Sequence, residues 1–184
     1  MENYKKLLWV AQAALLLALL VVVQLITKVI PASVPIVSQL ITGSLVNLIL
    51  VVGAGAVGFS ATAVAAVLSP VLAFAFGQMS IPPMVPVVAL GNLVIVAITW
   101  AFFKKDGRGV QTLGIIVGAV AKCAFLWAAA ALIVIPLFFK ASKLAAKITL
   151  LFSWPQLVTA LIGGFLALLV LPAVRRSLHS AQNK

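Results

Sequence analysis

Residues 48–61, LILVVGAGAVGFSA, decide between two folds for this chain. Gly53, Gly55 and Gly58 match the G-x-G-x-x-G fingerprint of dinucleotide-binding proteins, and the apolar run before them is compatible with a strand. That fingerprint requires an acidic residue about 20 positions further on, whereas the next acid is Asp106, 48 positions after Gly58. Both flanks are also long enough to cross a membrane. We therefore interpret the match as chance and predict a short turn between two closely packed membrane helices.

The composition indicates a membrane protein. Of the 184 residues, 65% are hydrophobic and 8% are charged, with a mean hydropathy of +1.29. A soluble protein has about 25% charged residues because its surface faces water. Thirteen Lys and Arg residues against two acids give a net charge of +11. The basic residues lie mainly beside apolar runs, so anionic membrane lipid is an expected partner and nucleic acid is not.

Six apolar runs have about the 20 residues that a transmembrane helix needs. They lie near 7–27, 36–53, 57–76, 84–103, 111–139 and 155–174. Prolines precede or open the second, fourth and sixth runs, where membrane helices are expected to begin. We expect one all-α integral-membrane domain over residues 1–184, with six transmembrane helices in one bundle and no cleavable signal peptide.

The distribution of Lys and Arg predicts the orientation of this bundle. With six spans, both termini lie on the same side, and that side carries eight basic residues against four on the other. The eight are Lys5, Lys6, Lys104, Lys105, Arg108, Arg175, Arg176 and Lys184, and the four are Lys28, Lys140, Lys143 and Lys147. Under the positive-inside rule, the N- and C-termini are therefore both cytoplasmic.

Residues 140–154, KASKLAAKITLLFSW, form a long segment outside the apolar runs. Its lysines recur at helical spacing, and its leucines and isoleucine follow the same period on another face, at Leu144, Ile148 and Leu151. This pattern predicts a short helix on the membrane surface between the fifth and sixth spans. The alternative is a solvated loop.

Lys122 lies near the middle of the fifth run, far from either membrane surface. It follows Gly114 and Gly118 at four-residue spacing and therefore extends a small-residue face toward neighbouring helices. The spans contain no acidic residue to pair with it. A carboxylate or phosphate on a bound ligand is a candidate partner. The alternatives are a neutral lysine and hydrogen bonds to backbone carbonyls or water.

Other polar residues are candidates for the same substrate-binding site. They gather at mid-membrane or toward the external side: Gln39, Thr42, Asn47, Gln78, Asn92, Gln156 and Thr159. Trp127, about one turn outward from Lys122, either stacks on a substrate ring or packs against lipid. Each polar residue taken alone is also explained by a hydrogen bond between helices. Together they predict a pocket that opens to the outside.

The first run carries a ridge of small residues. Ala11, Ala14 and Ala18 lie on one side of the predicted helix, and Ala14 and Ala18 have the spacing of closely packed membrane helices. The ridge packs either inside the bundle or against a helix of a partner protein.

Four stretches give the chain a family resemblance. SQLITGSLVN (38–47), LSPVLAFAFG (68–77), VALGN (88–92) and WPQLVTALIGG (154–164) resemble, in order and spacing, the substrate-binding S components of energy-coupling factor (ECF) transporters. The resemblance implies high-affinity binding of a vitamin or related micronutrient near the outer face of a prokaryotic plasma membrane. It also implies a transmembrane coupling subunit, which docks on Ala14 and Ala18, and two cytoplasmic ATPase subunits that power import.

The sequence disfavours two other classes of protein. A self-sufficient carrier or channel is the main alternative, but ion-coupled carriers usually keep a carboxylate in the membrane, and these spans have none. An enzyme is not expected, because the chain has no H-E-x-x-H motif, no nucleophile–histidine arrangement and no G-x-x-x-x-G-K-[ST] loop for ATP. No metal or cofactor is expected, and the single Cys123 is interpreted as a packed side chain.

Overall fold

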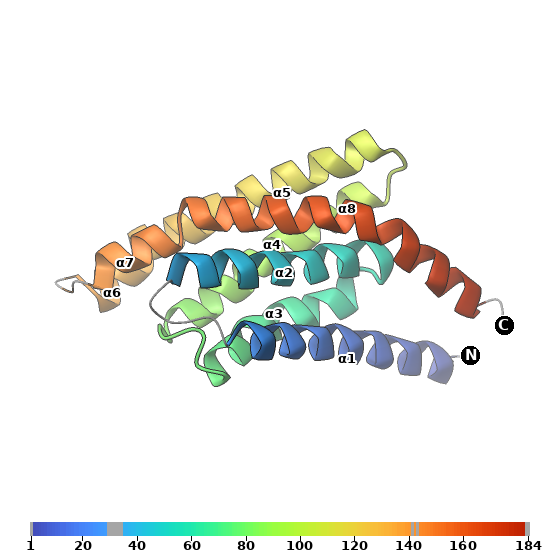
Figure 1. Cartoon of the computed structure of the whole chain (residues 1–184), viewed down its shortest axis with the longest axis horizontal. Helices are drawn as coiled ribbons and strands as arrows, with labels where there is room; N and C mark the ends of the chain where they lie inside the picture. The colour runs from blue at the N-terminus through green and yellow to red at the C-terminus, as the bar shows by residue number, and fades with distance from the viewer. Residues whose placement is uncertain (1, 29–34, 141, 143, 183–184) are drawn as a thin grey trace.

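Helices make up nearly all of the described chain and run alternately up and down one bundle (Figure 1). The computed structural model describes residues 2–28, 35–140, 142 and 144–182. The elements are α1 (Glu2–Thr27), α2 (Pro35–Ala56), α3 (Phe59–Ala75), α4 (Met84–Phe103), α5 (Arg108–Ala129), the π-helical η1 (Ala130–Val134), α6 (Ile135–Phe138), α7 (Leu144–Leu151) and α8 (Trp154–Gln182). The start of α1 and the end of α8 lie at the same end of the bundle.

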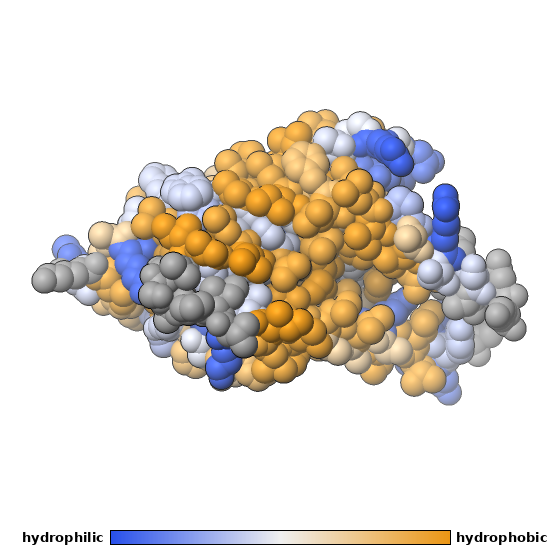
Figure 2. Space-filling model, in the orientation of Figure 1, coloured by the Kyte–Doolittle hydropathy of each residue, from blue (hydrophilic) through white to orange (hydrophobic). Residues whose placement is uncertain are grey.

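The predicted helical membrane bundle is confirmed within the described residues. Five helical stretches are long and apolar enough to cross a membrane, and α3, with 17 residues, is a shorter apolar helix. At 1.5 Å per residue, α3 extends about 25 Å, less than the roughly 30 Å of a bilayer core. Figure 2 shows hydrophobic surface across the middle of the molecule and hydrophilic residues toward its two ends. The cytoplasmic location of the termini stays a prediction.

The glycine-rich stretch forms the C-terminal end of α2 and the turn that leads into α3. Gly53 and Gly55 lie inside α2, so the turn is shorter than predicted, and only Gly58, with φ +116°, has a backbone conformation that favours glycine. A Cβ at Gly53 would lie 2.9 Å from the Thr62 hydroxyl oxygen, and one at Gly55 would lie 2.5 Å from the Phe103 ring. These glycines therefore let α3 and α4 approach α2 closely.

The fifth span contains a π-helical turn that the periodicity did not predict. Pro136 has no N–H to continue the α-helical ladder, and the Ile135 N–H bonds to the Ala130 carbonyl five residues back. The extra residue turns Val134 (2% exposed) toward the core and leaves Ile133 (55% exposed) outside. The proline thus shifts the buried face of the helix by one residue.

The predicted helix between the fifth and sixth spans is present as α7. Its Ile148 is fully buried in a cluster with Met84, Ala130, Val134 and Phe152, so its apolar face packs against the bundle. Lys140 precedes the helix, Lys147 lies on it, and Lys143 lies outside the described residues. A position on the membrane surface stays a prediction.

Helices α2 and α8 pack along much of their length because glycine removes the side chain from the contact. A Cβ at Gly163 would lie 2.7 Å from the Asn47 Cβ and 2.7 Å from the Leu48 backbone nitrogen, and would also meet the Ser44 carbonyl. A Cβ at Gly43 would lie 2.9 Å from Thr159 Cγ2. The close approach brings Asn47 and Thr159 together.

Gly163→Ala should therefore lower the free energy of unfolding by about 1–3 kcal/mol, because the added methyl group pushes against backbone atoms of α2. Thermal unfolding of the purified protein in detergent measures this loss. Gly109→Ala in the first turn of α5 is the matched control, since a Cβ there meets nothing within 4 Å. Equal effects of the two substitutions would contradict the close contact between α2 and α8.

Candidate substrate site around Lys122

Lys122 lies deep in the bundle because its helix face packs against α4. It stands 14 residues into α5, about 21 Å from the helix start, and is 2% exposed. A Cβ at Gly118 would lie 3.2 Å from Ile95 Cγ1, and one at Gly91 would lie 2.8 Å from Leu126 Cδ2. The predicted stripe of Gly114, Gly118 and Lys122 therefore faces a neighbouring helix, as expected.

Two asparagines from different helices accept hydrogen bonds from Lys122. Its Nζ donates to Oδ1 of Asn47 on α2 at 2.7 Å and to Oδ1 of Asn92 on α4 at 2.8 Å. Both asparagines are buried, at 1% and 2% exposure. A lysine ammonium carries three donors. Its third N–H has no acceptor within the part of the chain that the structure describes.

The opposite end of each asparagine amide also has a partner. Asn47 Nδ2 donates to the Gly43 carbonyl at 2.9 Å and, at 3.4 Å, to the hydroxyl of Thr159 on α8. Asn92 Nδ2 donates to the Ala66 carbonyl of α3 at 3.3 Å. Rotating either amide by 180° would set NH₂ against the ammonium and oxygen against a carbonyl, so chemistry fixes both orientations. We call Lys122, Asn47, Asn92 and Thr159 the lysine cluster.

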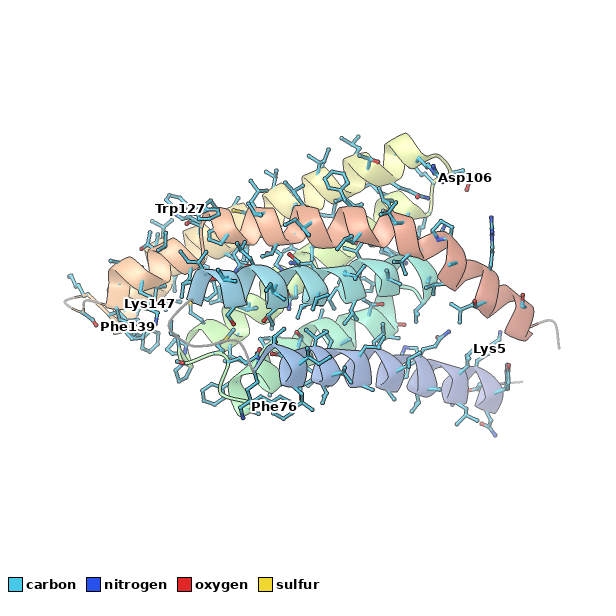
Figure 3. The ribbon with its side chains drawn as sticks, in the orientation of Figure 1. Lys5, Phe76, Asp106, Trp127, Phe139 and Lys147 are labelled. Atoms are coloured by element: carbon cyan, nitrogen blue, oxygen red, sulfur yellow. The ribbon has the colours of Figure 1, made fainter. Side chains whose placement is uncertain are left out.

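No carboxylate balances the charge of the lysine cluster. The only acidic residues of the sequence are Glu2 and Asp106. Glu2 pairs with Lys6 at 2.7 Å on the surface of α1, and Asp106 lies in the turn between α4 and α5 at the end of the bundle (Figure 3). Neutral amide oxygens are the polar partners that the described chain supplies, so the site keeps a net positive charge when Lys122 is protonated.

The predicted glutamines lie outside the lysine cluster. Gln39 Nε2 and Gln156 Nε2 both donate to the Leu151 carbonyl, at 2.6 and 3.3 Å. They connect α2 and α8 to the end of α7. Gln78 donates to the Gln24 carbonyl and, at 2.9 Å, to the Thr27 hydroxyl, and so connects the segment after α3 to the end of α1.

Trp127 does not face the lysine cluster. Its side chain is 48% exposed, and it lies on the outside of the bundle (Figure 3). This placement agrees with the interpretation that Trp127 packs against lipid. The described structure therefore gives no support to stacking of Trp127 on a substrate ring.

Four buried polar atoms have no hydrogen-bond partner within the described residues. They are Gln24 Oε1, Gln39 Oε1, Thr42 Oγ1 and Ser44 Oγ, on α1 and on the first half of α2. Gln24 is 1% exposed and was missed by sequence reasoning, although a glutamine in the first apolar run was a signal for it. Buried polar groups are almost always paired with protein, water or ligand. The unpartnered atoms therefore indicate where polar solute or water is needed.

A second polar centre closes the end of the bundle that carries the termini. Arg175 of α8 donates through Nε and Nη2 to the Gly55 carbonyl, at 3.0 and 2.8 Å, and so binds the C-terminal end of α2. A cavity of about 190 Å³ beside it is lined by residues 54–58, Trp100, Phe103 and Lys104. The positive-inside rule used Arg175 only to predict orientation, and no sequence pattern predicted this contact.

The alanine ridge of α1 faces outward. Ala11, Ala14 and Ala18 are all exposed, whereas Leu16 and Leu20 on the opposite side are buried against α2 and α3. The ridge is therefore not used for packing inside the described bundle.

Fold and site together define a polytopic helical membrane protein with a buried lysine at its polar centre. A family model for the ECF transporter, substrate-specific component, matches residues 9–175, and the chain therefore belongs to this family. No curated protein and no solved structure gives a significant match. The chain is thus a non-catalytic transport subunit that binds a small-molecule substrate and associates with the membrane and ATPase modules of an ECF importer. The family implies a prokaryotic plasma membrane.

The lysine cluster predicts energetic coupling between Lys122 and Asn47. Asn47→Leu should destabilise the protein, because it leaves a buried ammonium with one fewer acceptor. The double variant Asn47→Leu/Lys122→Met should lose about 1–3 kcal/mol less than the sum of the single losses. Thermal unfolding without ligand measures the cycle. The control is the cycle of Asn47→Leu with Cys123→Ala, because Cys123 follows Lys122 in the sequence and has no hydrogen bond to Asn47. The effects of these two substitutions should be additive. Additivity in the Asn47–Lys122 cycle as well would refute the coupling.

Proposed function

We propose that this chain is the high-affinity substrate-binding subunit of an ATP-dependent ECF importer for a vitamin or related micronutrient that carries a carboxylate or phosphate. The observation that carries the proposal is the buried Nζ group of Lys122, which has two amide acceptors and no acidic partner. The substrate's anionic oxygen binds the third N–H of Lys122.

The energetics favour an anionic substrate. A hydrogen bond to a charged group contributes about 1.5–3 kcal/mol, whereas removing an ammonium from water costs several kcal/mol. Two neutral amides offset part of that cost and leave the charge in place. A carboxylate or phosphate supplies a charge-assisted hydrogen bond and also neutralises the site.

The unpartnered polar atoms support a binding region that extends outward from Lys122 along α2. Thr42 and Gln39 lie five and eight residues before Asn47, about 7.5 and 12 Å along the helix axis. Their buried oxygens remain available for donors on the substrate. Thr159, Gln156 and Gln78 complete the proposed binding residues, the last two through the contacts that close the outer end of the bundle.

The proposed orientation supports a position of this region toward the outside. With both termini proposed to be cytoplasmic by the positive-inside rule, α4 and α8 begin at the outer face. Asn92 then lies eight residues, about 12 Å, from the outer start of α4, and Thr159 lies five residues from that of α8. A substrate arriving from outside has the shorter path to the lysine cluster.

Purified protein should bind at least one acidic vitamin, and Lys122→Ala should weaken that binding by at least about tenfold, because the charge-assisted hydrogen bond is lost. A thermal-shift panel of pantothenate, nicotinate, biotin and pyridoxal phosphate, followed by calorimetry, measures both. Lys147→Ala on α7 is the control for loss of positive charge. Undiminished affinity in Lys122→Ala would eliminate the proposed role of this lysine.

Transport distinguishes the importer subunit from a self-sufficient carrier. Liposomes that contain the chain, the coupling subunit and both ATPases should accumulate the bound vitamin only with ATP. Uptake by the chain alone without ATP would favour the carrier. The absence of a carboxylate in the apolar runs favours the importer.

The alanine ridge of α1 is the proposed docking surface for the coupling subunit. Ala14→Leu should reduce co-purification with that subunit, because a larger side chain prevents close helix approach, while vitamin affinity stays within about twofold. Ala124→Leu, at another exposed alanine on α5, is the matched control. Equal co-purification of both variants with the coupling subunit would place the docking surface elsewhere.

A further inference from the structure

We infer that Pro70 of α3 is a positioning residue for substrate binding, and that it acts through Asn92 on Lys122. This inference rests on the proposed function, because it concerns how the substrate-binding lysine is held. Pro70 lies inside α3 and is buried, as are Ser69 (3% exposed) and Ala66 (0% exposed), and it has no hydrogen bond to Lys122 among those of the described residues.

The proline leaves one particular carbonyl without its helical donor. In an α-helix the N–H of each residue bonds to the carbonyl four residues back, and proline has no N–H. The carbonyl that loses its partner at Pro70 is therefore that of Ala66. Ala66 is fully buried, so bulk water does not reach its carbonyl to replace the missing donor.

Asn92 supplies the missing donor. Its Nδ2 donates to the Ala66 carbonyl at 3.3 Å, across the interface between α3 and α4. The same amide presents Oδ1 to Lys122 Nζ at 2.8 Å. An unbroken chain of contacts therefore runs from the break in the α3 ladder to the ammonium.

The proline also determines how the Asn92 amide is oriented between the Ala66 carbonyl and Lys122. A carbonyl that lacks a helical donor competes strongly for an N–H, and the asparagine amide has its N–H groups at one end only. Binding Nδ2 to the Ala66 carbonyl turns Oδ1 toward Lys122. Two acceptors then hold the ammonium, Asn47 from α2 and Asn92 from α4, and leave the third N–H for the substrate.

Asn92 depends on this contact more than Asn47 depends on any one partner. Asn47 Nδ2 has two acceptors, the Gly43 carbonyl and the Thr159 hydroxyl, and Gly163 packs against the Asn47 Cβ. Asn92 Nδ2 has one acceptor on the described chain. A backbone donor restored at position 70 would bond to the Ala66 carbonyl, and should therefore release Asn92 and leave Asn47 in place.

Pro70→Ala tests the inference, because alanine restores an N–H at the position that bonds the Ala66 carbonyl. The protein should stay folded with an unchanged or higher unfolding temperature, since alanine is the better helix former. Affinity for anions should nevertheless fall about fivefold to tenfold. The probes are inorganic phosphate and acetate, titrated to millimolar concentrations against the full chain in detergent, with thermal shift as the readout, alongside the acidic vitamin panel.

Three further comparisons make the test specific. Pro172→Ala in α8 is the matched control, because Pro172 is also inside a helix but is exposed; it should leave anion affinity unchanged. In an Asn92→Leu background, Pro70→Ala should have no further effect on affinity. Without ligand, the coupling between Asn92→Leu and Lys122→Met in thermal unfolding should shrink when Pro70 is replaced.

The outcomes separate this inference from the proposed function. Anion binding that depends on Lys122 but is the same in Pro70→Ala as in the original chain overturns the inference and leaves the proposed function standing. An equal loss in Pro172→Ala also overturns it, because the effect is then general to helix prolines. Absence of stabilisation by every probe in the original chain overturns the anionic substrate, and the inference with it.

Discussion

A lysine buried inside a membrane bundle, without an acid to pair with it, is the constraint on which the rest of the structure depends. Lys122 Nζ needs acceptors at a depth where water is scarce, and they come from other helices because the adjacent residues on its own face of α5, Gly118 and Leu126, have no polar side chain. Asn47 and Asn92 meet this need from α2 and α4. Their helices come close enough only because Gly43, Gly91, Gly118 and Gly163 leave space for neighbouring side chains and backbone.

The sequence was informative where the membrane makes a residue costly. The apolar runs predicted the helices, and Lys122, Asn47 and Asn92 stood out because polar groups in lipid need partners. Helical periodicity states which face a residue occupies but not which helix lies opposite. The meeting of Lys122 with two asparagines, the burial of Ile148 and the outward placement of Trp127 depend on tertiary packing and therefore were not predictable from spacing.

Prolines inside helices show the same limit from another direction. Pro136 and Pro70 are visible in the sequence, and the loss of an N–H at each is certain. What replaces that N–H is a tertiary matter: a π-turn that shifts the buried face of the fifth span, and the amide of Asn92 on a neighbouring helix. The missing N–H of a proline can therefore be predicted from the sequence, whereas the group that replaces it depends on the tertiary structure.

The absence of an intramembrane carboxylate also distinguishes this chain from ion-coupled carriers. An ion-coupled carrier usually keeps a carboxylate of its own in the membrane to bind the coupling cation, whereas the spans of this chain contain no carboxylate. On the proposed function, the substrate itself is the missing counter-charge. Before the substrate binds, a protonated Lys122 has no counter-charge in a medium of low dielectric constant, whereas binding of an anion makes the centre of the bundle neutral. Selectivity follows from that difference, because a neutral analogue of the same shape occupies the space without removing the electrostatic cost.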